Sequence, residues 1–182
     1  MLQKLSDGLA RIELWLAAVL AAAVTLLILL NILTRALGMA LYWVDELAIY
    51  AMIWATFLAT SVVLKRRDAI TVTLLVDKLG ESGRFWLGIF ADLMVLVFAL
   101  ILLALCWRWL DPLTLISHRF DIKAFQADTF NFIYSEKTNT LGVAKIWPWL
   151  IVPIFSFSLS LHSLNNLLSR CVGFKLYERA SA

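Results

Sequence analysis

Long apolar stretches alternate with short polar segments along the chain. Four of these stretches are long enough to cross a bilayer, because a helix that rises about 1.5 Å per residue needs about 20 residues to cross a core roughly 30 Å thick. They cover residues 14–33, 42–64, 85–110 and 146–168, and a mixed segment at 111–145 separates the last two. The pattern predicts an all-α integral membrane protein whose residues 1–182 form a single membrane domain.

The first stretch could be mistaken for a secretory signal peptide, because Lys4 and Arg11 precede it and small residues follow it. Its apolar length exceeds the roughly 7–15 residues of such a signal. We therefore expect it to be retained as a membrane span.

Basic residues indicate how the spans are oriented. Ten of the sixteen Lys and Arg residues fall in segments 1–13, 65–84 and 169–182. By the positive-inside rule these segments are cytoplasmic, so both termini are expected inside and segment 111–145 on the periplasmic side. Seven of the eight tryptophans fall near span ends, where indole rings favour the headgroup level, and Trp54 alone lies in mid-span.

A short cytoplasmic surface helix is expected between spans two and three. Apolar residues recur there at helical spacing behind a basic cluster, namely Val72, Leu75, Val76 and Leu79 after Lys65, Arg66 and Arg67. Such a segment lies along the membrane surface, either as a plain connector or as a docking element.

Segment 111–145 is the one place in this pattern with room for structure outside the membrane. About 35 residues are too few to enclose a sizeable core of their own. We expect the segment to pack on the membrane face or on a partner, with a mobile loop as the alternative.

Three acidic residues fall within the predicted spans, where a charge is costly unless it is paired or wet. Asp45 and Glu46 open span two near the interface, so they either reach water or pair with a cation of a partner. Asp92 lies deeper in span three, and we expect it to form a buried ion pair. A transported-ion site at Asp92 is the weaker alternative.

Composition and motifs favour a non-enzymatic membrane component. The chain is 62% hydrophobic and 16% charged, and its net charge of +3 gives no reason to expect a nucleic-acid partner. His118 and His162 do not form paired haem ligands across spans, and Cys106 and Cys171 lack the spacing of a redox pair or a metal site. We expect no catalytic residues, no cofactor and no metal.

Spans one and two carry a family resemblance. Arg35 follows span one, Trp43 and Glu46 open span two in a W-x-x-E pattern, Trp54 lies within it, and Arg66 and Arg67 precede Ile70-Thr71-Val72. In this order and spacing the residues resemble the small membrane (DctQ-like) subunit of tripartite ATP-independent periplasmic (TRAP) transporters. Ala69 stands where members of the family commonly have a histidine.

The resemblance implies a system of three parts in a bacterial inner membrane. A periplasmic binding protein captures an organic acid, a large multi-span permease subunit moves it with a sodium gradient, and the small subunit supports and anchors the large one. The residues then expected at partner interfaces or as membrane anchors, in contact with protein or with membrane lipids, are Arg35, Trp43, Asp45, Glu46, Trp54, Arg66, Arg67 and Asp92. A stand-alone membrane redox or sensory protein is the competing hypothesis.

Overall fold

The computed structural model describes residues 1–66 and 80–181, apart from the side chains of residues 81 and 173–181. The expected surface helix and Arg67 lie outside the described residues. Within them the chain forms seven helices: α1 (Leu2–Ala36), α2 (Tyr42–Arg66), α4 (Glu81–Leu110), α5 (Pro112–Ser117), α6 (Ile122–Thr129), α7 (Ile146–Trp149) and α8 (Ile151–Ser181).

Four helical segments are long and apolar enough to cross a membrane, at Leu2–Ala36, Tyr42–Arg66, Ser82–Ser117 and Ile146–Val172. Each contains one of the four predicted spans, which confirms the all-α membrane fold. The first helix begins at Leu2, well before the expected start of its span at residue 14. The last span is interrupted, because α7 ends at Trp149 and α8 begins at Ile151, between the two prolines Pro148 and Pro153.

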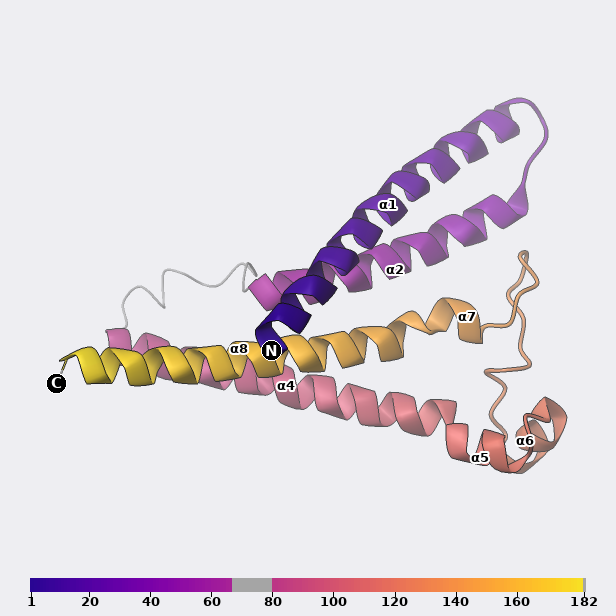
Figure 1. Ribbon diagram of the computed structural model, residues 1–182. Helices are drawn as coiled ribbons and strands as arrows, with labels where there is room; N and C mark the ends of the chain where they lie inside the picture. Colours follow the sequence, from indigo (N-terminus) through magenta and orange to yellow (C-terminus); the bar gives the residue numbers. More distant parts are fainter. Residues whose placement is uncertain (67–79, 182) are drawn as a thin grey trace.

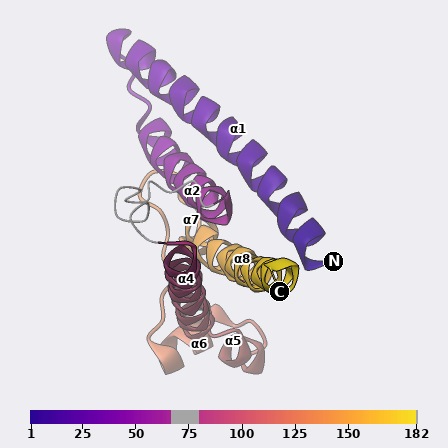
Figure 2. The ribbon, with the colours of Figure 1, turned by 90° about the vertical axis from the view of Figure 1, so that its left-hand side faces the viewer.

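The helices form two antiparallel pairs, α1 with α2 and α4 with α8, joined by contacts between α2 and α8 (Figures 1 and 2). The pairs lie closest where α1 begins and diverge toward the turn between α1 and α2 (Figure 1). We call the end with the start of α1 and the end of α2 the terminal end. The opposite end, with the α1–α2 turn and residues 111–145, is the loop end.

Two small apolar clusters hold the pairs together. Ala17, Leu58 and Ile151 bring α1, α2 and α8 into contact, while Ala99 of α4 packs with Phe155 and Leu159 of α8. Phe57 of α2 touches both clusters and meets the Phe155 ring edge to face, with 5.0 Å between ring centroids. Most other large apolar side chains are exposed on the outside of the bundle, as expected of a surface that faces lipid.

Residues 111–145 form an ordered cap on the loop end of α4. Phe125 of α6 is fully buried, and its ring lies edge-on to Tyr134. Tyr134 donates its hydroxyl proton to the carbonyl of Leu110 at 2.6 Å, and Asn131 Nδ2 donates to the carbonyl of Trp109 at 2.6 Å. Burial raises the pKa of the Tyr134 hydroxyl above its usual value. The segment thus packs on its own chain. It supplies donors to the last carbonyls of α4, which have no partners within the helix.

Candidate functional site

Four polar side chains from three helices meet in a buried cluster at the terminal end. Glu13 of α1 is 3% exposed, and Ser6 of α1, Ser61 of α2 and His162 of α8 are fully buried. Ser61 Oγ donates to Glu13 Oε1 at 3.1 Å, and His162 Nε2 lies 3.1 Å from Glu13 Oε2. Ser6 Oγ lies 2.7 Å from His162 Nδ1. We call these four residues the Glu13 cluster.

The protons of the Glu13 cluster follow from its geometry. A carboxylate only accepts hydrogen bonds, so the His162 nitrogen that faces Glu13 carries a hydrogen, and Ser6 satisfies the other ring nitrogen. Each ionisable group in the cluster therefore has a partner inside the bundle, where an unpaired one is expensive. The cluster joins α1, α2 and α8 at one point.

The order Ser6, His162, Glu13 is that of a hydrolytic triad, in which a histidine lies between a serine and a carboxylate. The serine and histidine here are completely enclosed. The cavity described beside His162 measures about 20 Å³, which suffices for about one water molecule and not for a substrate. The cluster is therefore built to join helices and not to bind a substrate.

A second set of contacts surrounds the Glu13 cluster. Arg170 of α8 donates from Nε to Asp92 Oδ2 of α4 at 2.8 Å, with side-chain exposures of 22% and 10%. Gly88 lies one turn before Asp92 and makes room for this contact, because a Cβ added there would collide with the Arg170 guanidinium group. The sequence left open whether the partner of Asp92 lay within the chain, and the structure provides it from α8.

The ends of α1, α2 and α8 are joined by further contacts at the same level. Lys65 of α2 pairs with Asp7 of α1 at 2.5 Å. Asn166 Nδ2 of α8 donates to the carbonyls of Lys65 at 3.0 Å and Leu64 at 3.3 Å, at the end of α2. Arg66, next to Lys65, is exposed.

At the loop end, α1 and α2 are joined by an ion pair. Arg35 Nη2 lies 2.6 Å from Asp45 Oδ2, and Arg35 Nε donates to Asn31 Oδ1 at 2.9 Å. Asn31 Nδ2 in turn donates to Asp45 Oδ1. The side chains of Arg35 and Asp45 are 56% and 39% exposed, so this pair lies at the edge of the bundle. Asp45 finds its cation within the chain.

Glu46 holds the tip of the segment between α6 and α7. Its carboxylate accepts the backbone N–H groups of Asn139, Thr140 and Leu141 at 2.8, 2.7 and 2.8 Å, and the Thr140 hydroxyl at 2.6 Å. Four donors on one carboxylate fix this turn against the start of α2, because hydrogen bonds to a charged acceptor are the stronger kind. From the sequence we expected Glu46 either to reach water or to pair with a cation of a partner, and the structure gives it donors from within the chain.

The two tryptophans singled out from the sequence lie in different environments. Trp54 donates its indole N–H to the carbonyl of Pro148 at 2.8 Å, where the last span is interrupted. Trp43 is 41% exposed near the start of α2. Trp54 thus connects helices, whereas Trp43 has the exposure and position of an interfacial residue.

Sequence reasoning missed Glu13 and Ser6 because it placed residues 1–13 in a cytoplasmic flank, and it did not single out Ser61 within span two. The buried residues of α1 are Ser6, Ala10, Glu13 and Ala17, which recur every three or four positions. A stripe of small and polar residues at this spacing marks one helix face. Extending this pattern into residues 1–13 would have predicted that Glu13 contacts another helix.

The redox alternative would depend on the two histidines and the two cysteines of the chain. Both ring nitrogens of His162 lie within hydrogen-bond distance of partners, and Cys106 and Cys171 are free thiols. His118 lies 3.3 Å from Asp128 in the loop-end segment, far along the chain from His162. This arrangement does not favour the redox alternative.

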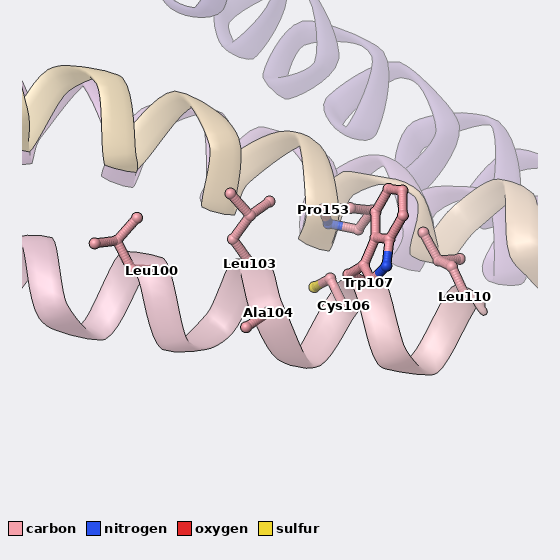
Figure 3. A pocket seen from close by; sticks show the side chains of 7 residues that line it. All are labelled: Leu100, Leu103, Ala104, Cys106, Trp107, Leu110 and Pro153. Atoms are coloured by element: carbon pink, nitrogen blue, oxygen red, sulfur yellow. The ribbon is translucent and has the colours of Figure 1, made fainter. Parts of the chain in front are cut away.

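An apolar groove runs along the loop-end half of α4 (Figure 3). It has a volume of about 460 Å³, and its lining residues are Leu100, Leu103, Ala104, Cys106, Trp107 and Leu110 of α4 and Pro153 of α8. No lining residue carries a charge, so the groove suits hydrocarbon and not an organic anion.

A family model described as "Tripartite ATP-independent periplasmic transporters, DctQ component" matches residues 24–173. The matched range includes Arg35, Glu46, Asp92 and His162, and begins after Glu13. No curated protein matches the chain.

Proposed function

Because the chain belongs to the DctQ family of TRAP transporter components and is therefore a transporter component, not an enzyme, we propose that it supports and anchors the large transport subunit. The location proposed is a bacterial inner membrane, which the chain crosses four times as one domain over residues 1–182. The observation that carries this proposal is the family match over residues 24–173, together with four apolar helices.

The pattern of contacts supports a scaffold role. Polar contacts join α1 to α2 at both ends of the bundle, and further contacts join α8 to α1, α2 and α4. Such a bundle resists sliding of one helix past another, because each slide would leave charged or polar groups unpaired in an apolar medium. A stationary support for a moving transport subunit needs this resistance.

The proposed orientation places the terminal end in the cytoplasm and the loop end in the periplasm, because basic residues concentrate at the terminal end. Residues 111–145 would then share the periplasmic surface on which a substrate-binding protein docks. Transport of an organic acid with sodium is part of the proposal and would be carried out by the large subunit. The charge-free groove on α4 is in keeping with this division of work.

The test is co-purification of the tagged full chain from cells that express the neighbouring transport genes, followed by uptake measurements. We expect recovery of a much larger multi-span protein and loss of uptake when this chain is deleted. A tagged, unrelated four-span protein controls for nonspecific recovery. A chain that purifies alone, in cells whose uptake does not require it, would contradict the proposal.

The docking role has its own test. Glu46→Gln weakens the hold on residues 139–141, so binding of the periplasmic protein to the reconstituted complex should weaken while assembly of the membrane subunits persists. Glu136→Gln, in the same segment but paired with Lys145, is the matched control. Equal binding by both variants and the parent complex would remove this part of the proposal.

A further inference from the structure

An exposed apolar face follows directly on the loop end of α4. Its side chains come from α5, α6 and the turns beside them, and they are Leu113, Ile116, Phe120, Ile122, Phe130 and Phe132. Phe120 and Phe130 are 67% and 78% exposed. We call these six residues the loop-end apolar face. Large apolar side chains that are exposed together on one short segment indicate a contact surface.

The position of the loop-end apolar face points to the membrane. The last turns of α4 carry Trp107 and Trp109, which are 58% and 36% exposed, and indole rings at a span end favour the headgroup level. Since α5 begins at Pro112, right after α4 ends at Leu110, the face emerges at that level. In Figures 1 and 2, α5 and α6 lie beyond the end of α4, away from α1.

The segment is built to keep these phenyl rings outside. Asp111 accepts the N–H of Thr114 at the start of α5, Asp121 accepts those of Lys123 and Ala124 at the start of α6, and Phe125 fills the interior. With its helices fixed in this way, the backbone holds Phe120 and Phe130 in left-handed conformations, with φ of 62° and 54°. Bulky residues rarely adopt this conformation, so it needs support from the surrounding structure.

The charges around the face favour an anionic surface. Arg108, Arg119 and Lys123 are exposed, and none of them forms an ion pair within the described part of the chain. Among the acidic neighbours, Asp111 and Asp121 cap helices and Asp128 lies beside His118. The three cations thus have no carboxylate partner among the described residues, while Asp111 and Asp121 accept backbone N–H groups and Asp128 contacts an imidazole.

A hollow of about 250 Å³ on α6 combines both chemistries. Its lining residues are Lys123, Gln126, Ala127, Phe130 and Phe132. An ammonium group and an amide beside two phenyl rings suit a phosphate headgroup with hydrocarbon next to it, since aromatic and basic side chains together favour the membrane interface.

We propose that the loop-end apolar face inserts into the interface of the leaflet on the loop side, with Arg119 and Lys123 against the phosphates of anionic phospholipids. The face thereby anchors α4 where it leaves the membrane, and this holds whether or not the chain supports a large subunit. Lipid is favoured over a protein partner because the face continues directly from a membrane span and carries unpaired cations among aromatic rings.

The test places a fluorescent label at three positions of the full chain, in a background with Cys106→Ser and Cys171→Ser. Phe120→Cys and Phe130→Cys report on the face, and Ser135→Cys, exposed on the same segment, is the control. Each labelled chain is reconstituted in nanodiscs of phosphatidylcholine and phosphatidylglycerol, alone and as a complex with the large subunit. Quenching is measured with a headgroup nitroxide lipid and with aqueous iodide.

We expect the nitroxide lipid to quench the labels at 120 and 130 several-fold more than the label at 135, and iodide to show the reverse order. In the unlabelled background, Lys123→Gln and Phe130→Asn should weaken association of spin-labelled phosphatidylglycerol with the chain. Asparagine accepts a left-handed backbone, so Phe130→Asn removes the ring without disturbing the turn, and unchanged circular dichroism checks this.

Two results would overturn the proposal. Iodide quenching of all three labels to the same degree would place the face in water. Protection from both quenchers that requires the large subunit or the periplasmic binding protein would make the face a protein interface instead.

Discussion

Replacing Glu13 by alanine removes the acceptor for two buried donors at once. His162 Nε2–H and the Ser61 hydroxyl both point at this carboxylate, and neither can turn to water because both residues are fully buried. Leaving a buried polar group unsatisfied costs about 1–3 kcal/mol, and Glu13→Ala leaves two such donors. We therefore expect Glu13→Ala to lower the free energy of unfolding by about 2–6 kcal/mol.

The isosteric change Glu13→Gln separates charge from geometry. The amide oxygen still accepts from His162, and the amide N–H₂ donates to Ser61, whose hydroxyl can rotate to accept. The remaining loss is the difference between a charge-assisted and a neutral hydrogen bond, about 1 kcal/mol. Gln3→Ala, at an exposed position in the first turns of α1, should stay within about 0.5 kcal/mol of the parent.

The measurement is reversible unfolding of the purified chain in mixed micelles, followed by tryptophan fluorescence and circular dichroism. A double-mutant cycle with His162→Ala should show strong coupling, because once Glu13 is gone the histidine has lost that contact. Our account of the Glu13 cluster fails if Glu13→Ala and Glu13→Gln are equally stable, or if Glu13→Ala and His162→Ala act additively.

Three further changes test contacts elsewhere in the bundle. Gly8→Ala, with open space around it, should be neutral or stabilise by up to about 1 kcal/mol. Gly88→Ala should be less stable than Gly8→Ala by about 1 kcal/mol, because the added Cβ moves the Arg170 guanidinium away from Asp92; equal melting temperatures would refute this. Glu46→Gln should speed tryptic cleavage in the segment it holds, and an unchanged cleavage rate would count against that hold. Trp54→Phe should lower the free energy of unfolding by about 1 kcal/mol, because the indole hydrogen bond is lost. An unchanged free energy of unfolding would contradict this contact.

The four helices could be predicted because each depends on local information. An apolar run of about 20 residues has few alternatives to a spanning helix, and the predicted stretches all lie inside the observed helical segments. The interruption of the last span between Pro148 and Pro153 is also consistent with residue type. What the sequence did not reveal is which helices lie side by side.

The contacts of single residues depend on that arrangement. The partner of Asp92 is Arg170, 78 positions away, and the partner of Trp54 is the carbonyl of Pro148, 94 positions away. Glu13 was placed in a flank because a charge just before an apolar run ordinarily faces water. Its burial becomes intelligible only when Ser61 and His162, from two other helices, are known to meet it.

The distance along the chain between the members of the Glu13 cluster bears on how the protein is made. Ser6 and His162 are 156 positions apart, and Glu13 and His162 are 149 apart. Because synthesis proceeds from the N-terminus, the first helix enters the bilayer long before its histidine partner exists. The hydrogen bonds between the first and last helices therefore form at the end of biogenesis. A chain truncated before α8 leaves Glu13 without its histidine partner, a feature by which quality control could distinguish unfinished molecules from complete ones.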